Sequence, residues 1–352
     1  MIEIKTVIQK VVEGGTLSRD EAAQTMDAVM NGDVTGAQLG ALVTALRIRG
    51  ETIEEITGFA STMREHALTV DVDSDDTPLL DTCGTGGDYS NSFNISTTAT
   101  FAIAASGVRI AKHGNRAASS RCGSADLLEG LGVRVELTPE QVAESVERVG
   151  VGFMYAPAFH PAMRYVGPTR REIGIRTVFN VLGPLTNPAG ARHQLIGVGH
   201  PEIAIKLAEV LSNLGSRRAV LVHGEEGVDE VGIVGKTAIT EWDADRGTIE
   251  TSTVTPADFG LATGTLNDIV GGDVDENVRI TRAVLAGENG PRRTITLMNA
   301  GAGLYAAQAV ASLAEGIQVA AETIDSGAAT RKLEELVAFT NEIAADAMKE
   351  PA

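Results

Sequence analysis

The amino-acid sequence predicts an α/β protein with a small, mainly helical N-terminal domain and a larger α/β domain built on a mostly parallel sheet. Helix-capping signals and helical spacing of apolar residues dominate the first seventy residues, and apolar strand candidates then alternate with helical runs. An acidic tract at residues 71–78 separates the two patterns. We therefore expect the domains to span residues 1–72 and 73–352.

The N-terminal part is expected to form about four helices. Ser18 with Glu21, and Thr52 with Glu55, fit the capping box S/T-x-x-E, in which the two side chains satisfy unpaired N–H groups at a helix start. Apolar residues between positions 39 and 46 recur at helical spacing, and glycines separate the segments. These signals predict helices that begin near Ser18 and Thr52.

The second part is expected to alternate strands with helices. Apolar runs at 108–111, 194–198 and 218–222 predict strands, and the run at 202–214 predicts a helix. Strands that alternate with helices pair in parallel, because each helix returns the chain to the starting edge of the sheet. The acidic tract at 71–78 is expected to be a solvated linker.

Two short motifs resemble nucleotide-binding signatures but lack the surrounding pattern. Residues 301–306 fit GxGxxA, yet no βαβ unit follows them, so we expect them to pack helices together. Residues 232–237 end like a P-loop, but Glu230 stands where the first glycine is required. We expect this second segment to be a turn that connects strands.

Composition favours a cytoplasmic globular enzyme. The chain has 352 residues, 43% of them hydrophobic, and only two cysteines, too few for a disulfide framework. Its formal net charge of −18 disfavours nucleic-acid binding, because unspecific affinity for nucleic acid requires cationic side chains. The weakly polar stretch 297–314 is interrupted by Asn299, Gln308 and Ser312, and no signal-like segment opens the chain, so no membrane association is expected.

A glycine turn in the segment 81–124 is the first candidate binding feature. Gly84, Gly86 and Gly87 permit positive φ angles and bring backbone N–H groups close to an anion. Such donors suit phosphate, so the turn predicts a site for a phosphorylated ligand.

A helix start and a basic loop follow the glycine turn. Asn94, Ser96 and Thr97 precede the apolar helical run 99–105, so we expect them to cap this helix while its N–H groups point at a ligand. Residues 112–116, with the sequence KHGNR, come directly after a predicted strand. We expect a second phosphate contact there.

The neighbouring acids Asp229 and Glu230 follow a predicted strand and a glycine-containing loop. Mg²⁺ accepts one or two carboxylates together with waters and substrate phosphate, so this pair is a candidate metal site. In an acidic protein the residues alone favour a solvated turn instead. Glu225, Glu226 and Asp243 carry no further support as ligands.

Five motifs, in order along the chain, carry a family resemblance: GTGGD, FNIST, KHGNR, GSADLLEGLG and RREIGIRTVFN. Together they resemble the anthranilate phosphoribosyltransferases of tryptophan biosynthesis over most of the chain. The resemblance implies a fold of the nucleoside phosphorylase and phosphoribosyltransferase type, in which part of 164–181 joins the helical domain in space. It also implies a homodimer.

The implied reaction transfers the 5-phosphoribosyl group from 5-phosphoribosyl 1-diphosphate to the amine of anthranilate. The products are N-(5-phosphoribosyl)anthranilate and diphosphate, and the implied cofactor is Mg²⁺. An aromatic amine is neutral near pH 7, so a covalent nucleophile is not required. Stabilisation of the leaving diphosphate and alignment of the two substrates are the expected tasks of the protein.

The resemblance assigns roles to matching positions. Short polar, glycine and basic residues are expected to bind phosphoribosyl diphosphate: Gly84, Gly87, Asp88, Ser92, Asn94, Ile95, Ser96, Thr97, Lys112, Asn115, Arg116, Ser119, Ser120 and Ser124. The residues expected to bind anthranilate are Gly84, His113, Asn115 and Arg170, and the last three of these are the expected catalytic residues. Asp229 and Glu230, with the Ser96 hydroxyl, match the metal motif.

The sequence departs from the family pattern at Tyr89, Ser92 and Cys122, where glycine, threonine and serine are usual. Ser92 keeps a hydroxyl, whereas Tyr89 places a bulky side chain beside the glycine turn. Two alternatives remain: an enzyme like the pyrimidine-nucleoside phosphorylases, and a noncatalytic relative that binds nucleic acid. KHGNR and RREIGIRTVFN argue against the first, and the acidic charge argues against the second.

Overall fold

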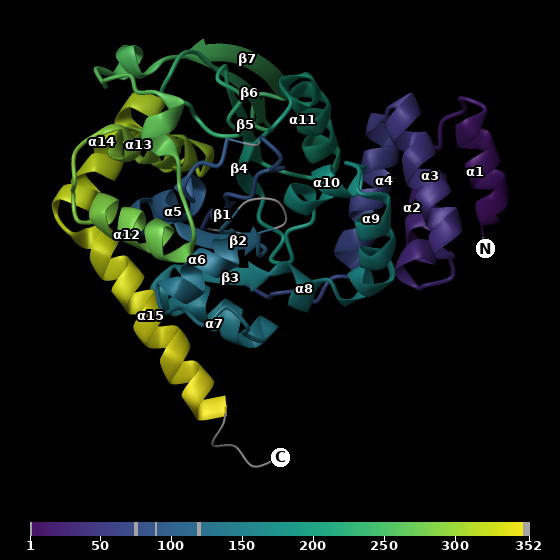
Figure 1. The fold of residues 1–352 in the computed structure, drawn as a ribbon, viewed down its shortest axis with the longest axis horizontal. Coiled ribbons are helices and arrows are strands. Elements are labelled where there is room, and N and C mark those ends of the chain that lie inside the picture. The colour runs from purple at the N-terminus through teal and green to yellow at the C-terminus, as the bar shows by residue number, and fades with distance from the viewer. Residues whose placement is uncertain (1, 74–76, 89, 118–120, 348–352) are drawn as a thin grey trace.

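The structure is a computed structural model that describes residues 2–73, 77–88, 90–117 and 121–347. A bundle of helices at the N-terminal end stands beside a larger body, in which helices surround a central sheet (Figure 1). The predicted fold class is therefore confirmed. Tyr89, Ser119 and Ser120, which the sequence analysis named, lie outside the described residues.

The N-terminal bundle contains the four expected helices. Both predicted capping boxes form: the Ser18 hydroxyl accepts a hydrogen bond from the Glu21 N–H at 3.2 Å, and Thr52 accepts one from the Glu55 N–H at 3.3 Å. The Glu55 carboxylate is fully buried and pairs with Arg49. The helices are α1 (Ile4–Val12), α2 (Arg19–Met30), α3 (Gly36–Arg49) and α4 (Ile53–Glu65).

The sheet of the larger body has seven strands in the order β3-β2-β1-β4-β5-β6-β7. The strands from β3 to β5 pair in parallel, and β6 and β7 add an antiparallel hairpin. The three strand predictions are confirmed as β2, β4 and β5. The strands are β1 (Leu79–Asp81), β2 (Arg109–Gly114), β3 (Val151–Tyr155), β4 (His193–Gly197), β5 (Arg218–Gly224), β6 (Thr237–Asp243) and β7 (Thr248–Val254).

Strand order reverses at β1, because β2 and β3 lie on one side of it and β4 and β5 on the other. Ligands of open α/β sheets bind in the crevice that such a reversal leaves at the carboxyl ends of the strands. The glycine turn at 84–87 begins three residues after β1 ends at Asp81. The topology therefore places this turn at the crevice.

Most of the helices that follow the bundle in the chain surround the sheet, whereas α9 lies beside the bundle helices (Figure 1). The predicted helix at 202–214 is confirmed as a short 3₁₀ turn followed by α11. No helix in the described ranges has the length and apolar character needed to cross a membrane. The helices are α5 (Ile95–Ala105), α6 (Ser124–Gly130), α7 (Pro139–Val149), α8 (Ala156–Phe159), α9 (Gly167–Ile173), α10 (Phe179–Leu182), α11 (Ala204–Asn213), α12 (Val274–Leu285), α13 (Pro291–Ala306), α14 (Leu313–Asp325) and α15 (Ala328–Ala347).

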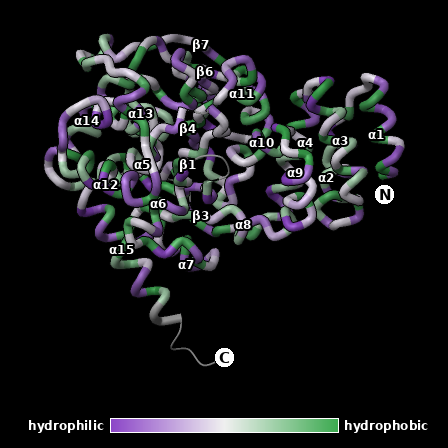
Figure 2. Tube along the Cα trace, in the orientation of Figure 1, coloured by the Kyte–Doolittle hydropathy of each residue, from purple (hydrophilic) through white to green (hydrophobic). Residues whose placement is uncertain are grey.

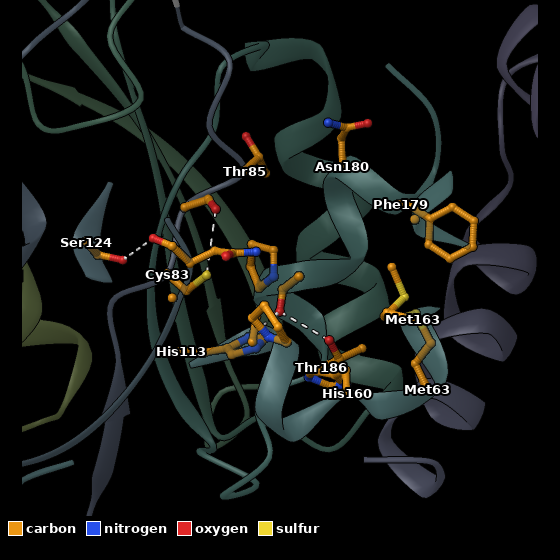
Figure 3. A pocket seen from close by; sticks show the side chains of 18 of the residues that line it. Met63, Cys83, Thr85, His113, Ser124, His160, Met163, Phe179, Asn180 and Thr186 are labelled. Atoms are coloured by element: carbon orange, nitrogen blue, oxygen red, sulfur yellow. Dashed lines mark hydrogen bonds between the residues drawn. The ribbon is translucent and has the colours of Figure 1, made fainter. Parts of the chain in front are cut away.

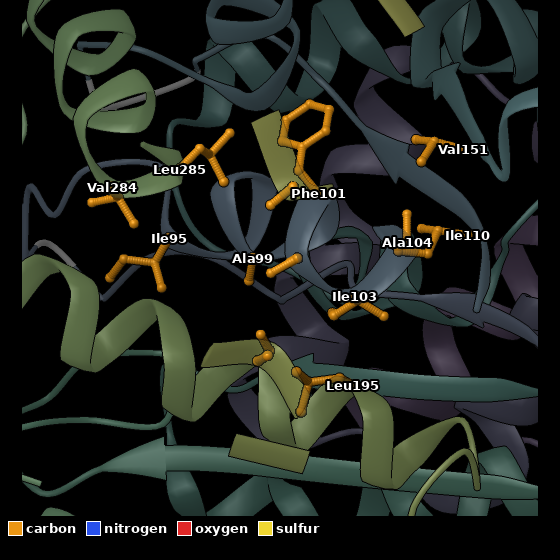
Figure 4. Close-up of a cluster of buried hydrophobic side chains, with 14 of the residues drawn as sticks. Ile95, Ala99, Phe101, Ile103, Ala104, Ile110, Val151, Leu195, Val284 and Leu285 are labelled. Atoms are coloured by element: carbon orange, nitrogen blue, oxygen red, sulfur yellow. The ribbon is translucent and has the colours of Figure 1, made fainter. Parts of the chain in front are cut away.

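Helix α5 forms the centre of the main core. Phe101 and Ile103 are fully buried, and Figure 4 shows them among side chains of β2, β4 and α12. Every residue of α5 from Thr97 to Ala104 is buried, and its polar side chains, those of Ser96, Thr97, Thr98 and Thr100, all lie in its first six positions. The outer helices α7 and α15 instead alternate between hydrophilic and hydrophobic residues along their length (Figure 2). The start of α5 is thereby fixed on a rigid core element.

The two rejected motifs have the expected structural roles. Residues 301–306 lie in α13, and a Cβ atom at Gly301 would stand 2.7 Å from the backbone nitrogen of Ile317 in α14. The glycine permits this close approach of helices, so the packing prediction is confirmed. Residues 232–237 connect β5 to β6, as predicted.

The helical bundle and the larger body share packing and hydrogen bonds. Helix α9 lies against α3, and one hydrophobic cluster unites Phe59 of α4 with Phe179 of α10 and Leu211 of α11. The Arg64 guanidinium of α4 donates to the carbonyl oxygens of Leu185 at 2.7 Å and Leu214 at 3.2 Å. The crevice is therefore bordered by both parts of the molecule.

Candidate functional site

Two adjoining cavities occupy the crevice. The larger cavity, of about 820 Å³, lies between the sheet and the helices α4, α9 and α10. The smaller cavity, of about 540 Å³, lies over the glycine turn and the start of α5. The residues that line both cavities are Thr82, Gly84, Thr85, Asn94, Ser96 and Asn180. A ligand in one cavity can therefore reach a ligand in the other.

The glycine turn forms the floor of the smaller cavity. Gly86 and Gly87 have φ angles of 62° and 78°, which favour glycine. The Gly86 N–H donates to Asp229 Oδ2 at 2.9 Å, so the turn is tied to the loop that follows β5. A Cβ at Gly84 would stand 3.1 Å from the Gly197 carbonyl oxygen, which explains why the turn can lie so close to β4.

The start of α5 differs from the prediction. Asn94 occupies the N-cap position, but its side chain makes no capping hydrogen bond. Its amide nitrogen instead donates to the Cys122 carbonyl oxygen at 3.1 Å and to Asn277 Oδ1 at 3.2 Å. The helix begins at Ile95, so Ser96 lies inside the first turn rather than before it. The capping prediction for Asn94 is wrong because tertiary partners take up its side chain.

The Lys112 ammonium lies beside the helix start. Its Nζ atom donates to the Thr82 carbonyl oxygen at 2.8 Å and to the Thr82 hydroxyl at 3.0 Å, with Ser96 Oγ at 3.4 Å. Only 4% of the residue is exposed, and this burial lowers its pKa. Asp81 and Glu230 oppose that shift by favouring the charged ammonium. The side chain therefore lies in the wall of the larger cavity, beside Thr82 and Ser96, which line both cavities.

Three carboxylates, those of Asp88, Asp229 and Glu230, line the smaller cavity. The protein around them raises the pKa of both Asp229 and Glu230, first through desolvation and then through repulsion from neighbouring carboxylates. Glu230 Oε1 accepts a hydrogen bond from the Ser96 N–H at 3.2 Å. Bringing a cation into this place would relieve the repulsion.

These groups fit Mg²⁺, which prefers oxygen ligands and keeps several waters. Across the described ranges no group of three or more histidine, cysteine, aspartate and glutamate side chains forms a ready-made metal cage. A Mg²⁺ ion held by one or two carboxylates together with substrate phosphate needs no such cage. Asp229 and Glu230, with the Ser96 hydroxyl nearby, supply the appropriate donors.

Two neutral histidines lie in the wall of the larger cavity (Figure 3). The rings of His113 and His160 are 5.0 Å apart between centroids. Burial lowers the pKa of His113 to about 3 and that of His160 to about 4. His113 Nδ1 lies 3.2 Å from the Gly183 carbonyl oxygen, which assigns the proton to Nδ1 and leaves Nε2 as an acceptor. The two rings are therefore uncharged near pH 7.

The two histidines make folding stability depend on pH. Unfolded imidazoles take up protons below about pH 6.5, whereas the folded rings stay neutral until about pH 4. Between these two pH values the unfolded state binds more protons than the folded state. Lowering the pH therefore lowers the free energy of unfolding, by up to about 1.4 kcal/mol per pH unit for each ring. Denaturant unfolding between about pH 7 and 5 measures the slope of the free energy of unfolding against pH. His160→Gln should reduce this slope by the contribution of one imidazole ring. Identical slopes in the two proteins would contradict this expectation.

Arg170 of α9 also lines the larger cavity. Its guanidinium carbon stands 5.6 Å from the centroid of the Phe179 ring, and burial lowers its pKa. No acidic side chain in the described part of the chain forms an ion pair with it. The guanidinium is therefore available to a carboxylate ligand.

The structure gathers every described residue of the predicted site around these cavities. The larger cavity is lined by Gly84, Asn94, Ser96, Thr97, Lys112, His113, Asn115, Ser124 and Arg170. The smaller cavity is lined by Gly84, Gly87, Asp88, Ser92, Asn94, Ile95, Ser96, Arg116, Asp229 and Glu230. Arg116 is engaged elsewhere, since it forms ion pairs with Glu129 and Asp126.

Several lining residues were missed by the sequence analysis. Thr85, His160, Arg176 and Asn180 all face the cavities, and Figure 3 shows all but Arg176. Arg176 Nη2 donates to the Gly86 carbonyl oxygen at 3.1 Å, and a Cβ at Gly87 would overlap its guanidinium. A signal was present: Arg176 and Asn180 stand in the motif that supplied Arg170, and His160 lies shortly before it.

Comparison with known proteins gives the class first. Residues 76–330 match the glycosyl transferase family, a/b domain, and residues 5–67 match the helical bundle domain of the same family. The fold and the crevice thus belong to a two-domain glycosyl transferase.

Relatives then give the particular family. Anthranilate phosphoribosyltransferases of Herpetosiphon aurantiacus and Moorella thermoacetica are 51% and 52% identical to this chain, and each comparison covers 97% of this chain and 100% of the relative. The crystal structure of the Thermus thermophilus enzyme matches with a TM-score of 0.89 and 46% identity, covering 95% of this chain and 99% of that one. The chain belongs to the anthranilate phosphoribosyltransferase family, and it is a pentosyltransferase of tryptophan biosynthesis.

A structure of the Saccharomyces cerevisiae enzyme in complex with PRPP and Mg, where PRPP is 5-phosphoribosyl 1-diphosphate, is also similar. It has a TM-score of 0.86 and 30% identity, and the match covers 96% of this chain and 98% of that one. The same yeast enzyme in complex with 4-fluoroanthranilate matches with a TM-score of 0.84, over 97% of this chain and 99% of that one.

Proposed function

We propose that this chain binds 5-phosphoribosyl 1-diphosphate in the smaller cavity and anthranilate in the larger one, and joins them where the cavities meet. The shared lining around Gly84, Thr85 and Asn94 is the observation that carries this proposal. Because the cavities share one wall of residues, an amine bound in one would approach the anomeric carbon of a sugar in the other from the side opposite the diphosphate. Such alignment alone contributes several kcal/mol to a reaction between two substrates.

Backbone and cationic donors would hold the diphosphate. The glycine turn at 84–87 and the first turn of α5 line this cavity, and Lys112 supplies a positive charge beside Ser96. Ser92, Asn94 and Thr97 add short polar side chains around the same space, together with Ser119 and Ser120 as predicted contacts. This distribution supports the sequence-based assignment of the phosphoribosyl diphosphate site.

Asp229, Glu230 and the Ser96 hydroxyl would hold Mg²⁺. Burial, and then repulsion from neighbouring carboxylates, raises the pKa of both acids, while Lys112 opposes the shift at Glu230. The yeast relative whose structure contains PRPP and Mg supports the same cofactor here. When bound, Mg²⁺ neutralises part of the charge that develops on the departing diphosphate. The chain's own part is to keep these oxygen donors close to the glycine turn.

Arg170 would bind the carboxylate of anthranilate through two parallel hydrogen bonds. The aromatic ring would then lie between Phe179 and His113, in a cavity that Asn115 and Gly84 also line. The yeast complex with 4-fluoroanthranilate supports an aromatic acid in this place. His113 is too weak a base to remove a proton, with a pKa of about 3, so we assign its Nε2 atom the task of accepting from the amine.

In the transfer, the bond between the anomeric carbon and the diphosphate oxygen breaks, and its electron pair leaves on the diphosphate. The amine nitrogen forms a new bond to the same carbon and then releases one proton to water. Lys112 and the start of α5 lie on the rigid sheet and core, so they would need only local changes of hydrogen bonding to stabilise charge on the departing oxygen.

The experiment that tests this function mixes purified protein with anthranilate, 5-phosphoribosyl 1-diphosphate and Mg²⁺. We expect one diphosphate released for each anthranilate consumed, and no conversion with EDTA or without the sugar diphosphate. A folded protein that binds the sugar diphosphate but leaves anthranilate unchanged would contradict the proposal.

The proposal includes a homodimer, a division into residues 1–72 and 73–352, and a cytoplasmic location. The helical bundle carries an apolar groove lined by α1, α3 and α9, flanked by Ile48 and Val12, which are 82% and 64% exposed. Covering this groove with a second copy would bury those side chains. Sedimentation should give twice the mass of one chain.

The cytoplasmic location rests on the scarcity of cysteines, since the sequence contains only two.

A further inference from the structure

We propose that Asn299 of α13 is a positioning residue that sets the orientation of the Asp229 and Glu230 carboxylates. The proposal rests on the proposed role of these acids in the smaller cavity. Asn299 itself does not line either cavity. It would therefore act on catalysis through the backbone of Val231, the residue directly after Glu230.

The contact between Asn299 and Val231 uses both polar groups of one residue. Asn299 Oδ1 accepts from the Val231 N–H at 2.8 Å, and Nδ2 donates to the Val231 carbonyl oxygen at 3.0 Å. The same nitrogen donates to the Ile295 carbonyl oxygen at 2.9 Å. Both Asn299 and Val231 are fully buried. Only this orientation of the amide satisfies all three partners.

The loop that carries the acids has an unusual pattern of hydrogen bonds. Four consecutive N–H groups, those of residues 231–234, are bonded to side chains and not to a neighbouring strand. Gly232 donates to the Thr237 hydroxyl at 2.9 Å, and Ile233 and Val234 donate to Glu226 Oε1 at 3.0 and 3.1 Å. Buried N–H groups require partners, so these side chains determine the path of the loop.

Among these partners, Asn299 alone comes from a helix. Glu226 belongs to the loop itself and Thr237 begins β6, whereas α13 is packed into the main core against α5 and α14. The amide therefore ties the loop to a rigid element. Side chains on rigid elements hold site geometry more tightly than loops do.

Restraint matters here because the acids repel one another. Asp88, Asp229 and Glu230 line one cavity, so three carboxylates of like charge face the same space. Without an external tie, a loop of this kind would relax by moving its carboxylates apart. The two hydrogen bonds from Asn299 fix the backbone N–H and carbonyl group of Val231, and with them the peptide plane that follows Glu230. The carboxylates of Asp229 and Glu230 therefore stay directed toward the cavity before a cation binds.

Asn299 is also an unfavourable choice for helix stability. Asparagine has low helix propensity, and a buried amide is costly unless its hydrogen bonds are satisfied. Its position in α13 precedes Gly301 and Gly303, which let the helix lie close to Ile317 and Ile103. The residue is therefore explained by its contact with the acidic loop rather than by the helix that contains it.

The test compares Asn299→Ala with Thr296→Val in the full-length protein. Thr296 is a matched control, since it is fully buried on the same helix and its hydroxyl donates only to the Arg292 carbonyl oxygen of that helix at 2.8 Å. Mn²⁺ serves as the probe, with its affinity measured by electron paramagnetic resonance in the presence of 5-phosphoribosyl 1-diphosphate. We expect Asn299→Ala to weaken Mn²⁺ binding by about 10- to 100-fold, and Thr296→Val to change it less than about twofold.

Kinetics provide a second readout. Asn299→Ala should lower kcat/KM for the sugar diphosphate while the KM for anthranilate stays within about twofold, because the larger cavity is not touched. Unchanged Mn²⁺ affinity in folded Asn299→Ala, or an equal loss in Thr296→Val, would overturn the proposal. If Asn299→Ala does not fold, Asn299→Ser carries the same expectations and the same overturning outcomes.

Two further measurements separate the positioning role of Asn299 from the assignment of Asp229 and Glu230 as metal ligands. Hydrogen exchange should show the Val231 amide as protected as the interior of α13, and rapid exchange would overturn the positioning role. Loss of Mn²⁺ binding in Asp229→Asn, with Asn299→Ala unaffected, would retain the acids as ligands and reject Asn299. Normal Mn²⁺ binding in Asp229→Asn would instead reject the site, and with it the positioning role.

Discussion

The double variant Asp229→Asn, Glu230→Gln is expected to lose at least about 100-fold in kcat at saturating substrates and Mg²⁺, comparable to removing a preorganised group that stabilises transition-state charge. Both substitutions keep the size of the side chain and remove its charge. The departing diphosphate then develops charge at a place that no longer attracts a cation. Initial rates over a Mg²⁺ titration measure the effect.

The double variant should lose activity but not folding stability. Folding buries Asp229 and Glu230 and sets them against the like charge of Asp88, which raises their pKa, so the two acids oppose folding near pH 7. The neutral amides remove that repulsion, and the midpoint of thermal unfolding should not fall. Glu225→Gln is the matched control, since Glu225 is an exposed acid of the same loop and should leave kcat unchanged. A double variant with full activity at limiting Mg²⁺ would reject the metal assignment.

Arg170→Ala is expected to raise the KM for anthranilate by about 10- to 100-fold. Loss of a charged hydrogen-bonding partner costs on the order of 1.5–3 kcal/mol, and each 1.4 kcal/mol is a factor of ten. The KM for the sugar diphosphate is the internal control, because Arg170 lines only the larger cavity. Steady-state kinetics with each substrate varied in turn measure both values.

Arg170→Lys sharpens the same test. Lysine keeps the positive charge but cannot form two parallel hydrogen bonds with a carboxylate or stack on Phe179 in the same way. We expect it to recover only part of the lost affinity for anthranilate. If either variant showed unchanged anthranilate kinetics, the carboxylate would have to bind elsewhere in the cavity.

Local signals made much of the fold predictable. A capping box needs only residues three apart, so Ser18 and Thr52 mark helix starts correctly. Apolar runs bounded by turn residues identified β2, β4 and β5. The order of the strands could not be obtained in this way, because pairing in a sheet depends on residues far apart in the chain.

The candidate site was predictable to a lesser extent. The family motifs named residues that the structure collects around two cavities, and their roles stay predictions. Arg176 and His160 were missed although they stand in or near the motif that contains Arg170, because a motif does not say which of its side chains face inward. Asn94 was assigned a capping role from its position alone, but its amide binds Cys122 and Asn277 instead.

By itself, the sequence determined the helical bundle, the alternation of strands and helices and the residue types available for a phosphorylated ligand, since these depend on neighbours along the chain. Only the tertiary structure decided which of these groups meet. The Gly86 N–H and Asp229 are 143 residues apart, and they touch because the strand order reverses at β1. Burial then gave His113 its low pKa and the acids their high ones, because desolvation depends on atoms from every element that surrounds a group.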